Sequence, residues 1–170
     1  MTAAPKPRGP HMVRELPASA QKVQDALDRT GVSCRVVAMP FTARTAQEAA
    51  HAIACEVGQI AKSILFRGLR SAKPILVIAS GANRINERTM QRLAGEPVAK
   101  PDAQFVRETT GFAIGGIPPL GFPRPIETWI DSDLLQFAEI WAAAGTPNMV
   151  FSVNPASLAA ITGGTVTRIV

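Results

Sequence analysis

The sequence has few of the residues on which several protein classes depend. Among its 170 residues there is no tyrosine, and there are two tryptophans and seven phenylalanines. We therefore do not expect an RNA-binding module that stacks bases on many aromatic side chains. The two cysteines, Cys34 and Cys55, cannot build a disulfide framework, and with two histidines no zinc-ligand pattern is visible. We expect neither a metal ion nor another cofactor.

Charge and targeting signals are also sparse. Charged residues make up 18% of the chain and hydrophobic residues 46%, which excludes disorder caused by low hydrophobicity. The excess of lysine and arginine, 18 against 13 acidic residues, gives a net charge of +5 and permits an anionic partner. No signal peptide is visible, and glycines and prolines interrupt the uncharged stretch from Ile140 to Thr167. We expect a cytoplasmic protein that does not enter a membrane.

The length and the element pattern favour one domain that contains both helices and strands. Residues 1–15 contain three prolines and no apolar run, so we expect a flexible tail there and a single domain over residues 16–170. The patterns predict helices over residues 19–31, 45–56, 86–93, 102–109 and 154–161. They predict strands over residues 33–39, 60–67, 74–80, 112–115, 126–130, 139–143, 149–153 and 165–170. This irregular interleaving is typical of an α+β fold on a mixed sheet.

Lys62 is the residue that most suggests chemistry. Side chains alternate across a strand, so Lys62 shares one face of the predicted 60–67 strand with Ile60, Ile64 and Phe66. A buried ammonium is costly unless it is paired or opens into a cavity. The alternative is a strand-edge lysine whose long side chain reaches water. The pattern alone favours that simpler alternative.

A second candidate is the glycine- and proline-rich segment from Gly111 to Gly121. Glycines let a backbone approach a ligand closely, and prolines stiffen a loop without adding donors. Exposed backbone N–H groups of such a loop can bind a carbonyl oxygen or an anion. The segment is neither a dinucleotide-binding GxGxxG motif nor a Walker A loop. A rigid turn without a binding role is the alternative, and the segment alone favours it.

No pair of nucleophile and base is visible. His11 lies in the expected tail, and His51 lies in a predicted helix where a surface or half-buried position is expected. Cys34 and Cys55 are expected to be small core residues. Any hydrolysis would then depend on positioning and electrostatics acting on a labile bond. Basic residues that could together follow a phosphate backbone, although each alone is typical of a solvated surface, are Arg67, Arg70, Lys73, Arg84, Arg88, Arg92, Lys100, Arg107 and Arg124.

Three segments, taken in order, resemble one protein family. Gly58–Phe66 is similar to the lysine-bearing strand of the YbaK/EbsC family, the aminoacyl-tRNA deacylases related to the editing domain of bacterial prolyl-tRNA synthetase. Thr110–Gly121 resembles the glycine–proline loop of this family, with Gly115 to Pro119 matching its Gly-x-x-x-Pro motif. Trp141–Pro155 resembles its C-terminal strand pair and the start of the next helix. The likeness spans about residues 19–164.

The resemblance implies a compact domain with a mixed, barrel-like sheet surrounded by helices. It implies hydrolysis, in trans, of the ester between a wrongly attached small amino acid and tRNA, with tRNA(Pro) as the expected tRNA. A positioned water or a substrate group would attack, without a metal or a covalent nucleophile. The implied catalytic residues are Lys62, which orients the substrate, and Gly115 and Gly116, which supply backbone contacts. The expected substrate-binding residues are Ser63, Ile117, Pro118, Pro119, Gly121 and Gly145.

The sequence departs from the family at positions that set specificity. The segment Met149–Ser152 lacks the acidic residue of the Cys-tRNA(Pro) deacylase branch. Ser63 stands where the alanine-specific branch has asparagine, and no histidine follows His51. The amino acid that is removed is therefore left open. Two other functions also stay open: a non-catalytic module that binds tRNA or an aminoacyl group, and a partner that docks on a tRNA synthetase.

Overall fold

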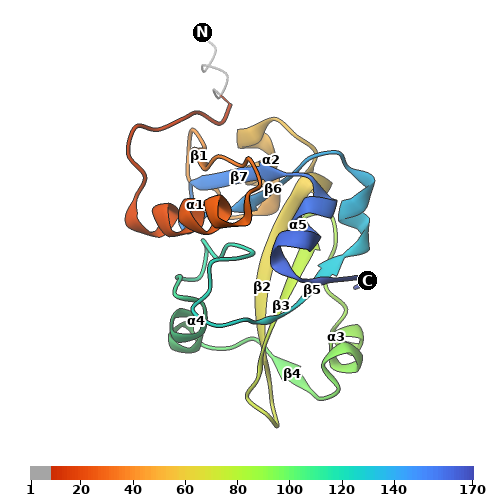
Figure 1. Cartoon of the computed structure of the whole chain (residues 1–170). Helices are drawn as coiled ribbons and strands as arrows, with labels where there is room; N and C mark the ends of the chain where they lie inside the picture. The colour runs from red at the N-terminus through yellow and green to blue at the C-terminus, as the bar shows by residue number, and fades with distance from the viewer. Residues whose placement is uncertain (1–8) are drawn as a thin grey trace, which may run out of the picture.

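The computed structural model describes residues 9–170, and residues 1–8 of the expected tail lie outside that range (Figure 1). The α-helices of this range are α1 (Ala18–Thr30), α2 (Ala46–Ile53), α3 (Glu87–Ala94), α4 (Ala103–Thr110) and α5 (Pro155–Thr162). Two 3₁₀ helices are η1 (Val57–Gln59) and η2 (Ser132–Gln136). The strands are β1 (Val37–Ala38), β2 (Ile60–Gly68), β3 (Pro74–Ser80), β4 (Val98–Ala99), β5 (Glu127–Asp131), β6 (Ile140–Ala143), β7 (Met149–Val153) and β8 (Thr165–Thr167).

The strands form one mixed sheet with the order β1-β7-β6-β2-β3-β5-β8, and β4 pairs with the far end of β2. β2 and β3 form a long antiparallel hairpin, paired from Ala61–Ser80 to Arg67–Pro74. β6 runs parallel to β2, and β5 runs parallel to β3. The predicted α+β fold on a mixed sheet is confirmed. The sheet is nevertheless not a closed barrel, because its path through the described residues begins at β1 and ends at β8.

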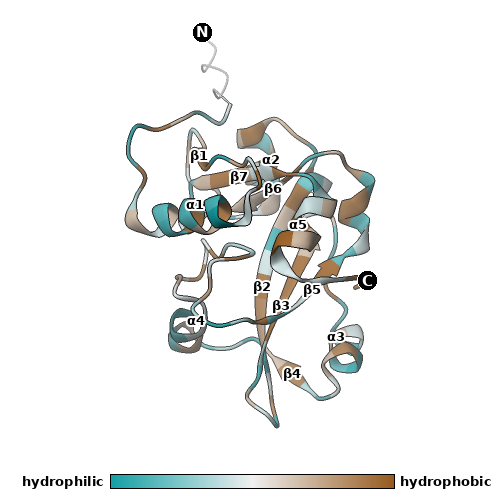
Figure 2. Ribbon diagram, viewed as in Figure 1, coloured by the Kyte–Doolittle hydropathy of each residue, from teal (hydrophilic) through white to brown (hydrophobic). Residues whose placement is uncertain are grey.

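Helices cover both faces of the sheet, because β2 presents apolar side chains on both. Ala61 and Leu65 lie on one face and belong to the largest core cluster, together with residues of α1, α4 and α5. On the other face, Ile60 packs with residues of α2, and Phe66 packs with residues of α3. Each fully buried Leu, Ile or Phe side chain contributes about 1.5–3 kcal/mol. Figure 2 shows this distribution, with hydrophobic residues along the strands and more hydrophilic ones on α1 and α4.

Polar N-cap residues define where most helices begin. Thr45, Asn86, Asp102 and Asn154 each accept hydrogen bonds from backbone N–H groups of the first turn, as their sequence positions predict. α1 differs, because its N-cap is Pro17 rather than the predicted Ser19. α2 ends before the predicted Glu56, because Ala54 adopts a left-handed conformation with φ of 63°.

Several predicted segments differ from the structure. The predicted strand over residues 112–115 is wrong: the chain turns after α4, where Gly111 has a φ of 79° and Thr110 Oγ1 accepts from Phe112 N at 3.0 Å. The first predicted strand shortens to β1, and β4 was not predicted. His11, in the expected tail, exchanges two backbone hydrogen bonds with Ala38 at 2.9 and 2.8 Å. Within residues 9–170 no helix is both long and apolar enough to cross a membrane.

Candidate active site

Within residues 9–170, Lys62 lies on a part of β2 that has a neighbouring strand on one side only. β2 pairs with β6 only at Ile60 and Ala61, and with β4 only at Arg67 and Gly68. Between these positions one edge of β2 has no strand beside it in the described residues, and a cavity of about 380 Å³ adjoins this edge. On its face of β2, Lys62 lies between the cluster that packs on α2 and the cluster that packs on α3. The predicted alternation therefore places the lysine at a gap between two apolar clusters.

The cavity is built from elements far apart in the sequence. Its apolar wall comes from the segments around α2, β2, β6 and β7 and includes Met39, Ala46, Ala49, Ile53, Ile60, Trp141 and Val150. Its polar lining consists of Arg44, Thr45, Lys62, Ser63, Lys100 and Thr146. No histidine, cysteine, aspartate or glutamate is among the lining residues. Ser63 Oγ is buried without a hydrogen-bond partner, so one hydroxyl beside the cavity is unsatisfied.

The Lys62 ammonium has a polar partner but no carboxylate beside it. Lys62 Nζ donates to the Asn83 carbonyl at 3.1 Å, and the residue takes part in no ion pair within residues 9–170. Burial lowers the pKa of Lys62 below its ordinary 10.5, and the like charges of Arg84 and Lys100 lower it further, whereas Asp131 raises it. A half-buried cation that has a carbonyl but no carboxylate as its partner is suited to bind an electron-rich group of a ligand.

The glycine–proline loop forms one rim of the cavity. Gly115 lines it with a φ of 98°, and nothing lies within 4 Å of the place where a Cβ would be. Ile117 also lines the cavity. Neither the Gly115 N–H nor the Ile117 N–H has a hydrogen-bond acceptor within residues 9–170, whereas Gly116 N donates to Ala113 O at 3.3 Å. Two unpaired backbone donors therefore lie on this rim.

Gly116 and Gly145 fasten this rim to the turn between β6 and β7. Gly145 N donates to Gly116 O at 2.9 Å. A Cβ on Gly116 would lie 2.7 Å from the carbonyl carbon of Gly145, and a Cβ on Gly145, where φ is 93°, would lie 2.7 Å from Ser19 O. Only glycine permits such approaches. The two glycines therefore shape the cavity without lining it.

The structure brings some of the predicted site residues to the cavity and leaves others outside its lining. The lining includes Lys62, Ser63, Gly115 and Ile117. Pro118 and Pro119 are buried next to the rim, whereas a Cβ on Gly121 would face Ala26 and Phe112. The sequence interpretation missed Arg44, Asn83, Trp141 and Thr146. The packing of α2 on β2 brings in Arg44, and the pairing of β2 with β6 and the turn after β3 bring in the others.

The histidine and cysteine side chains of residues 9–170 lie outside the cavity lining. His51 is exposed on α2. Burial raises the pKa of both thiols, Cys34 and Cys55, and this keeps them protonated at neutral pH. Residues 9–170 contain no cluster of three or more His, Cys, Asp or Glu side chains that could hold a metal ion. What the cavity offers is an ammonium group, cations at its edge and backbone donors, which together can orient and polarise an ester.

The sequence matches a known family over the same region. The family described as "Aminoacyl-tRNA editing domain" matches residues 42–161, which include Lys62, the glycine–proline loop and Gly145. The chain is 31% identical over 114 residues to the uncharacterized protein YwhH of Bacillus subtilis (strain 168), and the match covers 67% of this chain and 72% of that protein. It is 22% identical over 121 residues to the "Putative Cys-tRNA(Pro)/Cys-tRNA(Cys) deacylase EbsC" of Enterococcus faecalis (strain ATCC 700802 / V583), with 71% and 73% covered.

A solved structure has the same fold. The crystal structure of a "putative trans-editing enzyme for prolyl tRNA synthetase" superposes with a TM-score of 0.86 at 44% identity, over 91% of this chain and 98% of that chain. The resemblance to the YbaK/EbsC family is confirmed, and with it the general activity that the sequence predicts, deacylation of aminoacyl-tRNA. The chain belongs to the aminoacyl-tRNA editing domain family.

Proposed function

We propose that this protein acts in trans as a deacylase that removes a mischarged small amino acid from tRNA(Pro). The observation that carries the proposal is the cavity itself, with the Lys62 ammonium on its wall and the unpaired N–H groups of Gly115 and Ile117 on its rim. The name of a solved relative, a trans-editing enzyme for prolyl-tRNA synthetase, supports the choice of tRNA. The cytoplasm, where tRNA is charged, is the proposed location.

In this mechanism the protein positions the ester and stabilises the charge that develops on it. The Lys62 ammonium orients the aminoacyl group, and the N–H groups of Gly115 and Ile117 donate to the carbonyl oxygen as it becomes negative. A water, positioned alone or with help from a substrate hydroxyl, attacks the carbonyl carbon, and the bond to the tRNA oxygen breaks as that oxygen takes up a proton. Because no acid, histidine or cysteine lines the cavity, the proton passes to water or to a substrate group. Gly116 and Gly145 keep the rim in place.

The cavity wall limits which amino acid can bind. Met39, Ile53 and Trp141 offer apolar contacts, and no carboxylate lines the cavity to pair with a basic side chain. A basic side chain is therefore disfavoured, and the apolar wall favours an uncharged one. Size discriminates weakly, since one methylene changes binding by about 1–3 kcal/mol, so the identity of the amino acid has to be measured.

Two exposed cations at the cavity support a nucleic-acid substrate. Arg44 comes just before α2 and Lys100 just before α4, and both line the cavity. Each phosphate contact should add roughly 0.7–0.9 to the slope of log affinity against log salt concentration. Binding of tRNA should therefore weaken steeply with added salt. A flat response would remove tRNA as the main partner.

A non-catalytic module that binds tRNA or an aminoacyl group is the second candidate. The absence of a general base from the cavity lining favours it. Such a module would bind charged tRNA without shortening the lifetime of the ester. A partner that docks on a tRNA synthetase would instead co-purify with the synthetase and show no hydrolysis of its own.

Deacylation of charged tRNA(Pro) separates these functions. The tRNA is charged in turn with alanine, cysteine, serine, 2-aminobutyrate and proline, and loss of the ester is followed with wild-type protein, Lys62→Ala and Lys22→Ala. Lys22 is an exposed lysine on α1 outside the cavity lining and is the matched control. We expect wild type and Lys22→Ala to release one small amino acid, and Lys62→Ala to release none above the spontaneous rate. Binding of tRNA without hydrolysis would instead support the non-catalytic binding module.

A further inference from the structure

Asp131, at the end of β5, is a buried charge that the proposed mechanism does not use. Its exposed fraction is 0%, and it takes part in no ion pair within residues 9–170. Ser80 N and Asn83 Nδ2 each donate to Asp131 Oδ2 at 2.9 Å, and Asp133 N donates to Oδ1 at 3.0 Å. A carboxylate buried without a counter-ion is costly, and hydrogen bonds to both oxygens offset part of that cost.

Two of the groups that Asp131 binds, Ser80 N and Asn83 Nδ2, lie at the end of β3 and in the turn that follows it. Asn83 N donates to Ser80 O at 3.0 Å, and Asn83 Nδ2 donates a second bond, to Asp133 Oδ2, at 2.7 Å. Gly81 N donates to Ile60 O at 2.7 Å. The turn is thus fastened to the end of β5 on one side and to the start of β2 on the other.

The same turn carries the only polar partner of the Lys62 ammonium within residues 9–170. Asn83 O accepts from Lys62 Nζ at 3.1 Å. Contacts therefore run from the Asp131 carboxylate to the Asn83 side chain, and from the Asn83 carbonyl to the ammonium in the cavity. Asp131 and Asn83 are both outside the cavity lining, so neither is placed to touch a bound substrate.

We propose that Asp131 and Asn83 are positioning residues for the deacylation: Asp131 holds the Asn83 side chain, and the Asn83 carbonyl holds the Lys62 ammonium at the cavity. This inference rests on the proposed function of Lys62. The restraint matters because a lysine side chain has many rotamers, and each must be given up when the ammonium is fixed. Loss of the restraint should slow the chemical step, since a small misplacement of a positioned group lowers the rate.

The charges around Lys62 are consistent with this role. Arg84 of the same turn and Lys100 before α4 lower the pKa of Lys62, and Asp131 raises it. Arg44, before α2, also lines the cavity and adds positive charge. Asp131 is the one acidic group among the neighbours that shift the pKa of Lys62, so it favours the ammonium form against this surplus of cations.

Asn83→Ala tests the proposal. Asp131→Asn is the less informative variant, because a new NH₂ group would face hydrogen-bond donors and could unfold the protein. The matched control is Asn86→Ala in the same segment after β3. Asn86 accepts from Arg88 N and Thr89 N as the cap of α3, and it has no hydrogen bond to Lys62, Asn83 or Asp131 within residues 9–170. Each variant loses hydrogen bonds of its asparagine side chain, those to Asp131 and Asp133 in Asn83→Ala and those of the helix cap in Asn86→Ala. Denaturant midpoints of unfolding therefore have to be measured for both, to show whether the two variants are equally destabilised.

Two measurements are made on each variant. With the charged tRNA that wild type hydrolyses, we expect Asn83→Ala to lower kcat about tenfold or more with KM changed less than about threefold, and Asn86→Ala to leave both within about twofold. By NMR, the two Cε hydrogens of Lys62 should have distinct chemical shifts in wild type and in Asn86→Ala. They should share one averaged shift in Asn83→Ala, because the carbonyl that accepts from the ammonium is kept but the side chain that anchors it to Asp131 and Asp133 is lost.

Equal kcat values for the two variants would overturn the positioning role while leaving the deacylase function in place. Cε hydrogens that are already equivalent in wild type, or that stay distinct in Asn83→Ala, would overturn it as well. If wild type hydrolyses none of the charged tRNAs, the proposed function fails, and the NMR measurement on its own still decides whether Asn83 restrains Lys62.

Discussion

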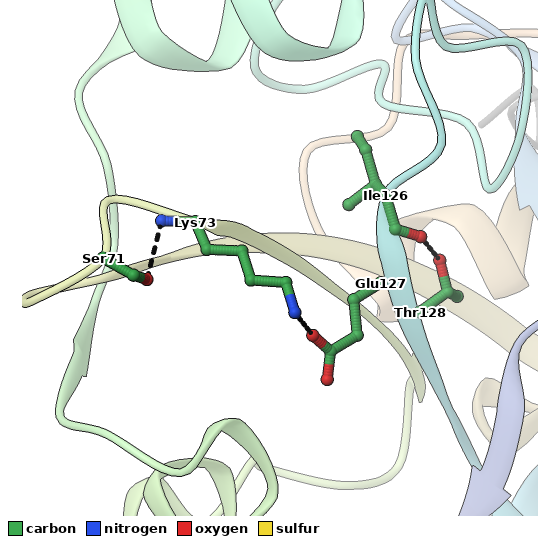
Figure 3. A network of polar contacts seen from close by, with 5 residues as sticks. All are labelled: Ser71, Lys73, Ile126, Glu127 and Thr128. Atoms are coloured by element: carbon green, nitrogen blue, oxygen red, sulfur yellow. Dashed lines mark hydrogen bonds and ion pairs between the residues drawn. The ribbon is translucent and has the colours of Figure 1, made fainter.

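The two ends of the β2–β3 hairpin place a lysine in opposite situations. At one end, Lys62 is half-buried beside the cavity, and its Nζ donates to a carbonyl. At the other end, Lys73 has a side chain that is 59% exposed and forms an ion pair with Glu127 of β5, as Figure 3 shows. The same residue type in one hairpin therefore has two different electrostatic environments.

Polar groups at the hairpin tip satisfy one another. Lys73 N donates to Ser71 Oγ at 3.1 Å (Figure 3). The carboxylate of Glu96 accepts from Arg70 N and Ser71 N at 2.9 and 3.0 Å, and these bonds lower the pKa of Glu96 below its ordinary 4.5. Each partner is another group of the protein, so this end of the hairpin is a closed structural turn.

At the cavity end, by contrast, polar groups are left without partners. Ser63 Oγ is buried and unpaired, and the N–H groups of Gly115 and Ile117 have no acceptor within residues 9–170. Buried polar groups of folded proteins are normally satisfied. Ser63 Oγ is such an exception beside Lys62, and a second, Trp129 Nε1, lies on β5 outside the cavity lining. The cavity end thus differs from the hairpin tip in having free donors and a free hydroxyl around its lysine.

The sharpest test of this contrast is a matched pair of lysine variants. Lys62→Met keeps the length of the side chain but removes the ammonium, and we expect kcat/KM for deacylation to fall by about 10²–10³, the loss typical of one electrostatic group at a reacting centre. Lys73→Met should leave kcat/KM within about twofold. Steady-state rates with the charged tRNA and circular dichroism of both variants check this. Equal losses of kcat/KM in the two variants would contradict the claim that only the cavity end of the hairpin takes part in catalysis.

Two glycines test whether the two ends differ in packing as well. A Cβ on Gly81 would collide with the Val57 carbonyl oxygen and lie 2.9 Å from Ala46 Cβ, both fixed by α2 and η1. We expect Gly81→Ala to cost about 1–3 kcal/mol of unfolding free energy. A Cβ on Gly68 would meet the side chains of Glu96 and Ser71, which can move, so Gly68→Ala should cost clearly less. Denaturant unfolding of both variants measures this, and a reversed order would contradict the rigid cavity end.

The fold was predictable where local chemistry determines it. Asn86, Asp102 and Asn154 cap helices at the predicted places, and the apolar run Pro74–Ser80 is a strand over its full predicted length. The predicted strand at residues 112–115 failed because Thr110 and Gly111 close a helix end and redirect the chain. The two-residue strand β4 has no pattern of its own, and its pairing with β2 is a tertiary contact.

The candidate site was predictable only in part, for a related reason. Alternation along β2 put Lys62 on an apolar face, and the glycine–proline motif marked the loop at Gly115. Asn83 and Asp131, which lie 48 positions apart, meet only because β3 and β5 run side by side. No spacing in the sequence indicates that pairing, so the network behind Lys62 could not be inferred from the residues alone.

A smaller effect should appear in the pH dependence of the reaction. Burial, Arg84 and Lys100 lower the pKa of Lys62 below 10.5. If the ammonium is the active form, activity falls as the pH rises through this lowered pKa, earlier than for an exposed lysine. Arg84→Gln removes a like charge, raises the pKa of Lys62 and should move the fall to higher pH. Rates corrected for spontaneous hydrolysis measure this, and a shift to lower pH would contradict the assignment to Lys62.

The smallest effect is expected at the hairpin tip. Exposed ion pairs contribute about 0–1 kcal/mol, because water and salt screen the charges. A double-mutant cycle on the stability of Lys73→Met, Glu127→Gln and the double variant should give a coupling of about 0.5 kcal/mol or less, smaller still at high salt. A larger, salt-insensitive coupling would mean that the tip is as electrostatically organised as the cavity end. The two lysines would then differ only in where they lie along the hairpin, and the contrast between their electrostatic environments would be wrong.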